Sequence, residues 1–572
     1  MKILLLFPPH WTPAMPHLAL PTLTAYLRAH GVEVIQRDLN VEFFDALLTR
    51  SALEDVLARL QEQARCASGV QSPTLRSALT AAPRLIAQVE GAKALFRSPD
   101  FFAGEASLVS FLTLAQSLDL AALPFTPTEF SLTNFRPPVY ADSSSNLLHI
   151  VDDPQHNIFL DFFRRHVLPD IVREQPDIVG ISIPTLDQMI AGMTLGHLIK
   201  AAGLPCHVTV GGPHISMLRE QLPKVPAMFR LFDSAVIFDG ENALLRLAET
   251  VAGDGDLSQV PNLIYNDRGS VRRTPVETGP HPDLLPDFDG LPLERYLVPT
   301  PVLPLLSAHG CYHGRCGFCN VGYGGPGAFS PLDADLVVEH MLALRTKYGA
   351  RHIFFADEAI TPHNLKGMST RLAEAGAPVH WCGCVRFDAA LTRDLLERMA
   401  QSGCRMLLFG LETAAERTIR RMDKGTKPAE MSRILRDSTA AGIWNHTFFF
   451  FGFPGETMED AQETVNFVYA HQDAIHSASP GAFLLERYAP VARAPGKYGV
   501  TIHDDPHRDL AIYFDYDVAS GLDEPMADTL ASRLIDVLPE KKFGQFYIHD
   551  SYRFLYAGDL HEKGQALPLW LA

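Results

Sequence analysis

Apolar and polar positions repeat with two different periods along the first part of the chain. Lys2–Phe7 is a short apolar run of strand type, Leu18–His30 carries apolar residues at helical spacing, and Val32–Leu39 alternates as a strand does. From about residue 42 to residue 166 the period is mostly helical, as in Ala52–Ala64. We therefore predict a β-α-β opening that is followed by a helical insertion at about 42–166.

The alternation of strands and helices resumes after this insertion. Pro176–Pro184 and Cys206–His214 have the pattern of buried strands, a helix is predicted between them over Leu186–Ala202, and Val236–Asn242 supplies a further strand end. Short strands that alternate with helices predict a doubly wound parallel sheet, which binds ligands at the carboxyl ends of its strands. The pair Gly211-Gly212 falls at such an end, where the missing Cβ lets a ligand approach the backbone.

A second series of strand-like runs begins near residue 302, and helical segments separate its members. The strand candidates are Val302–Leu306, His352–Ala356, Val379–Arg386, Arg405–Leu411, His446–Phe451 and Ala482–Tyr488. Six such βα units are typical of a partial barrel, whose active site lies at the carboxyl ends of the strands. The predicted fold class is α/β: a Rossmann-like domain, then a partial (β/α)6 barrel of the TIM type, then a small C-terminal α+β region.

A proline-rich stretch separates the two series. We expect the Rossmann-like domain over residues 1–275, a linker over 276–293 and the barrel over 294–505. The remaining residues, 506–572, are expected to cap the barrel and select the substrate, or to form a small aromatic core of their own.

Composition narrows the class of protein. The chain has 572 residues, with 49 Lys and Arg against 66 Asp and Glu, for a formal net charge of -17. This charge argues against extensive binding to nucleic-acid phosphates. The apolar start ends at Pro8-Pro9 without a cleavage site, so we expect no signal peptide and, from the later apolar runs, no transmembrane segment. Eight cysteines in so long a chain suit a reducing cytoplasm.

Three cysteines lie within nine positions in the loop after the first strand of the second series. Cys311, Cys316 and Cys319 have the spacing C-x4-C-x2-C. Three thiolates can hold a four-iron cluster in which one iron lacks a protein ligand and binds a small molecule instead. A structural zinc site completed by His309 or His313 is the alternative, but zinc sites usually join two separated ligand pairs, and no second pair follows. We therefore favour a 4Fe-4S cluster.

Two further cysteines occur on the third predicted strand of this series. Cys382 and Cys384 are two positions apart and therefore share one face of the strand. They either line the barrel or pack as small apolar groups, and we expect packing.

Gly180–Met189 followed by Val210–His214 resembles the two loops that hold the nucleotide tail in cobalamin-binding Rossmann domains. The same loops are also compatible with other doubly wound domains. The resemblance implies a cobalamin site formed by Thr185, Leu186, Gly211, Gly212, Pro213, Gly240 and Glu241. Domains that place a histidine below the cobalt carry D-x-H-x-x-G, and neither His10 nor His17 has that spacing, so we assign no lower axial ligand.

The cysteine loop at the head of six βα units resembles the radical S-adenosylmethionine (SAM) superfamily. That family's loop is usually C-x3-C-x2-C with an aromatic residue before the third cysteine; here the first gap is one residue longer, as in some cobalamin-dependent members, and Phe318 is the aromatic. The resemblance implies that SAM is bound by Phe318, Asp357, Glu358, Arg386, Glu412, Gly452, Gly455 and Glu456. Without it, Glu412 would be interpreted as a helix cap and the two glycines as a turn.

Together the two resemblances imply a cobalamin-dependent radical SAM enzyme with a 4Fe-4S cluster, SAM and cobalamin as cofactors. We expect a methyltransferase acting on an unactivated carbon, in which one SAM is the methyl source and another the source of a 5′-deoxyadenosyl radical. Its partners would be an organic or peptide substrate and a one-electron donor such as flavodoxin or ferredoxin. The alternatives are a cyclisation or rearrangement without methyl transfer and, less favoured, a cobalamin-binding sensor with an inactive barrel.

Overall fold

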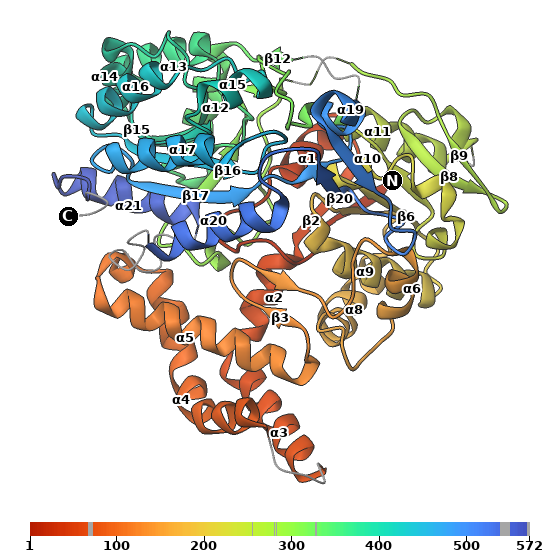
Figure 1. Ribbon diagram of the computed structural model, residues 1–572. Coiled ribbons are helices and arrows are strands. Elements are labelled where there is room, and N and C mark those ends of the chain that lie inside the picture. The colour runs from red at the N-terminus through yellow and green to blue at the C-terminus, as the bar shows by residue number, and fades with distance from the viewer. Residues whose placement is uncertain are drawn as a thin grey trace. The chain divides into compact units, whose positions relative to one another are not determined.

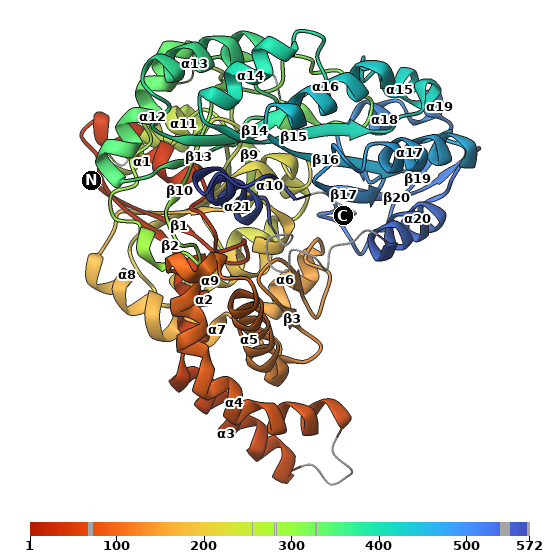
Figure 2. The same ribbon diagram turned by 90° about the vertical axis from the view of Figure 1, so that its left-hand side faces the viewer.

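The computed structural model describes residues 1–66, 72–253, 255–279, 281, 283–325, 329–537 and 549–568 (Figures 1 and 2). The chain divides into two compact units. Met1–Thr300 and Pro506–Ala511 form the first, and Pro301–Asp505 and Ile512–Ala572 form the second. The division therefore falls after the proline-rich stretch, and one late segment of the chain returns to the first unit.

Two contacts hold that late segment within the first unit. Arg508 Nη2 lies 2.7 Å from the carboxylate of Asp142, which is almost completely buried. Asp509 accepts hydrogen bonds from the backbone N–H of Ser144 at 2.8 Å and from its hydroxyl at 2.5 Å. These residues are more than 360 positions apart in the sequence, so local patterns do not indicate that they meet.

The first unit is built on a seven-stranded sheet with the order β2-β1-β5-β6-β7-β8-β9. The strands are β1 (Lys2–Phe7), β2 (Glu33–Asp38), β5 (Ile178–Ser182), β6 (His207–Gly211), β7 (Ser234–Val236), β8 (Leu263–Asp267) and β9 (Ser270–Arg273). The first five are parallel, and β8 and β9 add an antiparallel hairpin at the edge. The order reverses between β1 and β5, which is the flavodoxin-like arrangement with a ligand crevice at the carboxyl ends of the strands. The predicted doubly wound sheet is confirmed.

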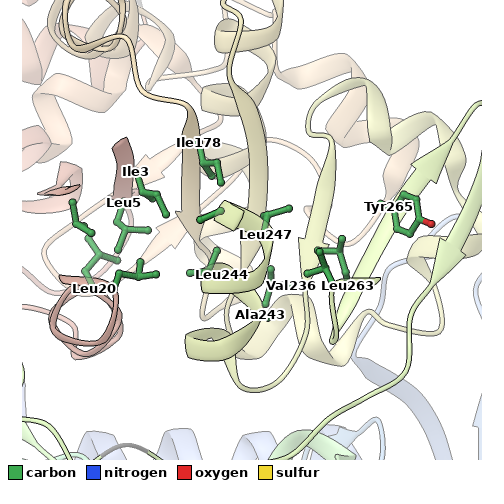
Figure 3. Close-up of a cluster of buried hydrophobic side chains, with 14 of the residues drawn as sticks. Ile3, Leu5, Leu20, Ile178, Val236, Ala243, Leu244, Leu247, Leu263 and Tyr265 are labelled. Carbon is green, nitrogen blue, oxygen red and sulfur yellow. The ribbon is translucent and has the colours of Figure 1, made fainter. Parts of the chain in front are cut away.

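Helices cover both faces of this sheet, which explains why β1 is apolar at nearly every position. The helices that follow the parallel strands are α1 (Ala19–Ala29), α9 (Met189–Ala201), α10 (Pro213–Met217) and α11 (Gly240–Ala252). Figure 3 shows Leu20 of α1 and Leu244 of α11 in one cluster with Ile3 of β1 and Ile178 of β5, all of them buried. Burying each such side chain contributes roughly 1.5–3 kcal/mol relative to leaving it exposed.

Between β2 and β5 the chain forms mostly helices, as the helical period predicts. They are α2 (Leu39–Leu47), α3 (Arg50–Cys66), α4 (Pro73–Phe96), α5 (Glu105–Ala122), α6 (Ser144–Ile150), α7 (Leu160–Phe162) and α8 (Leu168–Glu174), with a short hairpin of β3 (Glu129–Phe130) and β4 (Phe135–Arg136). In both views α3, α4 and α5 project from the sheet of the first unit.

One helix of this insertion differs from the expectation that no segment is apolar enough to span a membrane. Glu105–Phe125, which is α5 and the turn after it, passes that test by length and composition, and 50% of its most apolar window is buried inside the protein. A single helix of this kind is weak support for a membrane span, because the core helix of a soluble protein passes the same test.

The second unit contains a six-stranded parallel sheet in which every strand lies beside the next one in the sequence. The strands are β10 (Val302–Leu305), β13 (His352–Phe355), β14 (His380–Val385), β15 (Cys404–Glu412), β16 (Trp444–Phe451) and β17 (Ser477–Ala482). The helices between them are α12 (Ala334–Tyr348), α13 (Pro362–Glu374), α14 (Arg393–Gln401), α15 (Glu416–Met422), α16 (Pro428–Ala440) and α17 (Met458–Ala470). This is the predicted partial barrel.

The sixth strand was predicted in the wrong place. The strand is Ser477–Ala482, which pairs in parallel with β16, rather than Ala482–Tyr488. Its sequence, Ser-Ala-Ser-Pro-Gly-Ala, lacks the branched and aromatic residues that identify a strand. Leu485–Glu486 forms the short β18, which pairs with β20 (Tyr513–Val518) instead.

The end of the chain adds a small α+β region to the second unit. Strands β18, β20 and β19 (Val500–His503) form an antiparallel sheet, which is accompanied by the short helices α18 (Pro490–Arg493) and α19 (Pro495–Tyr498) and followed by α20 (Glu524–Val537) and α21 (Asp550–Glu562). Of the predicted aromatic stretch from Phe543 to Tyr556, residues 543–548 lie outside the described residues.

Helix α21 closes the amino-terminal end of the barrel. The ring of Phe554 lies 5.3 Å from that of His352, the first residue of β13. Nη2 of Arg405, near the start of β15, lies 2.8 Å from Nε2 of His561. Ligands therefore reach the barrel interior from the carboxyl ends of its strands.

Candidate functional site

The barrel strands of the second unit alternate between buried and accessible residues. Phe355, Phe409 and Phe449 are fully or almost fully buried, and Figure 2 shows α13, α14 and α16 along one side of the strands. The residues between these positions are accessible in spite of their place in the sheet, and they include Phe354, Glu358, Cys384, Arg386, Gly410, Glu412, Phe448, Phe450, Ser479 and Gly481. Because neighbouring strand residues point to opposite faces, the accessible set lines the barrel interior, which we call the lumen.

The cysteine loop begins at the carboxyl end of β10, at the mouth of the lumen. Cys316 is buried and Cys311 and Cys319 are half-buried. Burial is the main reason that the pKa of Cys319 rises to about 12, and Glu358 and the other two loop cysteines raise it further. The three thiols and one lumen carboxylate therefore influence one another electrostatically. A thiol whose pKa is raised in this way needs a bound metal centre or nearby cations to persist as a thiolate.

Two cations lie beside the buried cysteine of the loop. Arg386 Nη1 is 3.9 Å from Cys316 Sγ. Burial raises the pKa of Cys316, while the charges of Lys424 and Arg386 lower it. The positive charges therefore favour the thiolate form that an iron–sulfur cluster requires.

The alternative of a zinc site requires side chains that converge on one ion. Within the described parts of the chain, no group of three or more His, Cys, Asp or Glu side chains is arranged to hold one metal ion. A zinc site needs such convergence on a point, whereas a four-iron cluster binds each cysteine through a different iron. In addition, the Nε2 atom of His313, one of the two alternative zinc ligands, is hydrogen bonded to the carbonyl of Asp423 at 2.6 Å.

The two acidic residues after β13, Asp357 and Glu358, have different surroundings. Asp357 is almost completely buried and accepts hydrogen bonds from Ser307 N at 2.9 Å and Ser307 Oγ at 2.5 Å. Burial raises its pKa to about 7, and the bonds from Ser307 oppose that rise. Glu358, in contrast, is accessible and faces the lumen, with a pKa that desolvation raises. Of the two residues, Glu358 is the one that a ligand can reach.

Glu412 and Arg386 both face the lumen. Glu412 has a positive φ of 59°, an uncommon conformation for a residue other than glycine, and Lys424 Nζ lies 2.6 Å from its Oε1. The guanidinium of Arg386 lies 5.9 Å from the ring centroid of Tyr312 in the cysteine loop. Phe318 packs edge-on against Phe450 at 5.2 Å and is thus part of the lumen wall.

The turn after β16 is braced from inside the protein. Gly452 and Gly455 have φ values of 85° and 86°, which favour glycine. Glu456 is fully buried, its Oε2 accepts a hydrogen bond from Gly452 N at 2.5 Å, and burial raises its pKa to about 7. Its carboxylate is therefore directed at the turn itself. Gly452 is buried with Ala527 against it, whereas Gly455 is partly accessible and lies against the side chain of Arg421.

Two site residues carried no signal in the sequence. Lys424 follows α15 and lies in no recognisable motif, yet its ammonium is beside Glu412 and 5.6 Å from the ring centroid of Phe318. Glu486, in β18, is electrostatically coupled to Glu358, and burial followed by that carboxylate raises its pKa to about 7. Their positions depend on chain folding after β15 and β17, so a local pattern does not reveal them.

The structure also settles the surroundings of Cys382 and Cys384. Cys382 is fully buried, as expected. Cys384 is partly accessible and faces the lumen, within the electrostatic influence of Asp550, Glu358 and Glu412. It is therefore a lining residue, and the expectation that it packs as a small apolar group was wrong.

The cobalamin-site candidates of the first unit gather at neighbouring strand ends. They follow β5 (Thr185, Leu186), β6 (Gly211, Gly212, Pro213) and β7 (Gly240, Glu241), and all are partly accessible. Gly212 has a φ of 110°, and a Cβ there would come within 2.8 Å of the carbonyl oxygen of Ile183. Glycine thus lets two strand-end loops approach closely, which leaves an accessible backbone surface for a large flat ligand.

Neither histidine near the end of β1 is presented as a free ligand. His10 Nε2 is 2.8 Å from the carbonyl oxygen of Ser131, and burial lowers its pKa to about 4. His17 Nδ1 accepts a hydrogen bond from Ala19 N at 3.2 Å, so its neutral ring carries the proton on Nε2. The ring also stacks on Phe7 at 4.9 Å.

The family model of the radical SAM superfamily matches residues 305–468, which contain the cysteine loop and strands β13 to β16. This part of the chain is therefore similar to the radical SAM superfamily. The radical SAM region is thus the lumen and loop described above.

Two methyltransferases are similar in sequence to this chain. An uncharacterised methyltransferase of Pyrococcus horikoshii is 26% identical over 333 residues, which cover 55% of this chain and 70% of the relative. Cytidylyl-2-hydroxyethylphosphonate methyltransferase of Streptomyces wedmorensis is 26% identical over 376 residues, which cover 56% of this chain and 67% of the relative.

Solved radical SAM structures show the same fold over almost the whole chain. The methyltransferase TsrM of Kitasatospora setae, solved with cobalamin and a [4Fe-4S] cluster, has a TM-score of 0.59 at 14% identity and covers 98% of this chain and 99% of its own. The cobalamin-dependent enzyme OxsB, solved with aqua-cobalamin and SAM, has a TM-score of 0.60 at 14% identity and covers 99% of this chain and 75% of its own. The protein therefore has the fold of cobalamin-dependent radical SAM enzymes, as the two resemblances in the sequence implied.

Proposed function

We propose that the protein is a cobalamin-dependent radical SAM methyltransferase that acts on an unactivated carbon. The observation that carries the proposal is the cysteine loop at the lumen mouth, with Arg386 and Lys424 beside Cys316. The accessible glycine-rich strand ends of the first unit support the cobalamin part, and the methyltransferase names of two relatives support the reaction.

Cys311, Cys316 and Cys319 hold the cluster in this proposal. When bound, the cluster supplies the electron that cleaves a carbon–sulfur bond of SAM, and cobalamin supplies a carrier for the methyl group. The chain's own contribution is to place SAM: Glu358 receives its amino group, Arg386 its carboxylate and Glu412 its ribose hydroxyls. Gly452 shapes the turn, and the partly accessible Gly455 is the residue of this motif that approaches the adenine.

The lumen keeps the reaction away from water. Its amino-terminal end is closed by α21, and its walls carry Phe354, Phe448 and Phe450. A reactive carbon-centred radical survives only where competing hydrogen donors and water are excluded. Small residues on the inner face, Cys384 and Ser479 among them, leave space for the substrate.

In the first unit, the residues after β5, β6 and β7 hold cobalamin in this proposal. Thr185 and the backbone of Gly211 and Gly212 approach the nucleotide tail, since a tail that crosses the strand ends needs accessible N–H groups and no obstructing Cβ. Glu241 lies in the first turn of α11 and has a pKa that burial raises.

An external one-electron donor and an organic or peptide substrate complete the proposed system. Flavodoxin and ferredoxin are the classes of donor that reach the potentials such clusters need. Seven cysteines, which are Cys206, Cys311, Cys316, Cys319, Cys382, Cys384 and Cys404, are free of disulfides, and this suits our proposal of a reducing, cytoplasmic location.

The proposal is tested by anaerobic reconstitution with iron, sulfide and hydroxocobalamin, followed by electron paramagnetic resonance (EPR) and product analysis. We expect a reduced-cluster signal that changes when SAM is added, and a product that carries the labelled methyl group of isotopically labelled SAM. A product without label overturns the methyltransferase assignment in favour of cyclisation or rearrangement. A protein that binds cobalamin but shows no SAM-responsive signal is the inactive-barrel sensor.

A further inference from the structure

The loop after α15 engages the cysteine loop and the neighbouring Arg386 through three consecutive carbonyl groups. The Met422 carbonyl accepts a hydrogen bond from Gly317 N at 2.7 Å, and the Asp423 carbonyl is 2.6 Å from His313 Nε2. The Lys424 carbonyl accepts a hydrogen bond from Arg386 Nη2. We call Met422–Gly425 the clasp loop, because its backbone is bonded to both the cysteine loop and the arginine beside it.

The side chain of Lys424 extends from the clasp loop into the lumen wall. It is 7% exposed, its Nζ lies 2.6 Å from Glu412 Oε1, and Glu412 is 12% exposed. The ammonium is also 5.6 Å from the ring centroid of Phe318. Lys424 therefore lies between the aromatic residue of the cysteine loop and the carboxylate at the end of β15.

The barrel makes space for this ion pair. Gly410 stands two residues before Glu412, and a Cβ at Gly410 would overlap Glu412 Oε1 and come within 2.8 Å of Lys424 Nζ. Glu412 itself adopts a φ of 59°. The contact thus needs both a glycine at position 410 and a strained backbone at Glu412. This indicates that the carboxylate of Glu412 is held in one specific position.

A buried ion pair is a poor way to stabilise a barrel. Desolvation of the two charges cancels much of their attraction, and apolar side chains of the same volume stabilise as well or better. Such a pair is justified where it fixes the direction of a charged group. Lys424 engages Oε1 of Glu412, which directs the other carboxylate oxygen away from the clasp loop.

We propose that Lys424 is a positioning residue, which holds Glu412 so that it accepts hydrogen bonds from the ribose hydroxyls of SAM, while its carbonyl holds Arg386 beside Cys316. This inference rests on the proposed function, because it assumes that SAM occupies the lumen. It assigns Lys424 no contact with SAM.

The test uses the full-length protein with its cluster reconstituted, and it compares Lys424→Met with Lys424→Arg and Lys427→Met. Lys427 is exposed and lies three residues away, so its variant controls for the loss of a lysine. The first measurement is the iron and sulfide content. The second is the affinity for SAM by equilibrium dialysis. The third is the change that millimolar methionine causes in the EPR signal of the reduced cluster, since methionine has the amino and carboxylate groups of SAM but no ribose.

We expect Lys424→Met to keep its cluster, to bind SAM at least about tenfold more weakly and to respond to methionine as the wild type does, because a charge-assisted hydrogen bond is at stake. Lys424→Arg restores most of the affinity and Lys427→Met changes nothing. An unchanged SAM affinity in Lys424→Met overturns the inference. So does an equal loss of SAM and methionine binding, which would identify Lys424 as general support of the loop.

A double-mutant comparison removes the dependence on one variant. If Lys424 acts through Glu412, then Lys424→Met causes no further loss of SAM affinity in a Glu412→Ala background. An additive loss contradicts the inference. A wild-type protein that holds its cluster but binds no SAM refutes the proposed function instead, so the two failures are distinguishable.

Discussion

Asp357 holds Ser307 with both of its carboxylate oxygens, at 3.1 and 2.9 Å from the backbone nitrogen and at 2.5 Å from the hydroxyl. Ser307 is the residue from which the cysteine loop departs, and Asp357 lies two residues after the end of the neighbouring strand β13. Asn364 adds a hydrogen bond from its Nδ2 to the Ser307 carbonyl at 3.0 Å. The loop thus begins from a residue whose backbone and side-chain polar groups are all fixed, which fixes the direction of the chain toward Cys311.

Removing this anchor is expected to loosen the cysteine loop. Asp357→Ala leaves the buried N–H and hydroxyl of Ser307 without acceptors, at a cost of roughly 2–4 kcal/mol in the free energy of unfolding. Urea denaturation measures that cost, and iron content after reconstitution measures its effect on the loop. The control is Asp388→Ala. Asp388 is a carboxylate near the same loop, and its contact with Tyr312 Oη is a long hydrogen bond of 3.4 Å. Equal effects of the two variants would contradict the role of Asp357 in fixing the start of the cysteine loop.

Glu456 is expected to make stability depend on pH. Burial raises its folded pKa from 4.5 to about 7. The folded state therefore holds the proton more tightly than the unfolded state, so this group's contribution to stability falls as pH rises from about 4.5 to about 7 and is constant above. The change amounts to about 3 kcal/mol.

The measurement is the urea midpoint of the wild type and of Glu456→Gln at several pH values across that window. The glutamine variant keeps an acceptor for Gly452 N but has no proton to lose. We expect its stability relative to the wild type to increase with pH. A constant difference between the two proteins would show that Glu456 does not titrate in this range.

Gly212 is expected to be essential for cobalamin binding. A Cβ at this position meets the backbone of Ile183 and is strained by the φ of 110°, so Gly212→Ala displaces the loop after β5 or β6. Gly203→Ala is the matched control, since Gly203 also has a positive φ but its Cβ would meet nothing within 4 Å. Titration with hydroxocobalamin, followed by absorbance, should show at least about tenfold weaker binding for Gly212→Ala alone.

The loop cysteines are expected to hold the cluster independently of the first unit. Replacing Cys311, Cys316 and Cys319 by alanine should abolish iron–sulfur absorbance and SAM cleavage while hydroxocobalamin still binds. Cys384→Ala, which changes a lumen thiol outside the loop, should retain iron. Retained SAM cleavage in the triple variant would refute the cluster assignment.

Comparison of the sequence with the structure shows which features local patterns reveal. The two series of βα units, the spacing of the cysteine loop and the glycines at the strand ends were all readable, because strand and helix periods and turn residues act over a few positions. The strand at Ser477–Ala482 could not be predicted, because its small residues, which line the lumen, carry no strand pattern.

The sequence by itself determined the α/β fold class and the resemblance to cobalamin-dependent radical SAM enzymes, and it supplied the candidate residues of the site. Only the tertiary structure decided that Asp357 faces Ser307 while Glu358 faces the lumen, that Lys424 pairs with Glu412, and that α21 closes the barrel. The physical reason is the separation along the chain of the residues that interact. A residue's type and spacing fix its local conformation, but the direction of its side chain depends on partners that folding brings from distant positions.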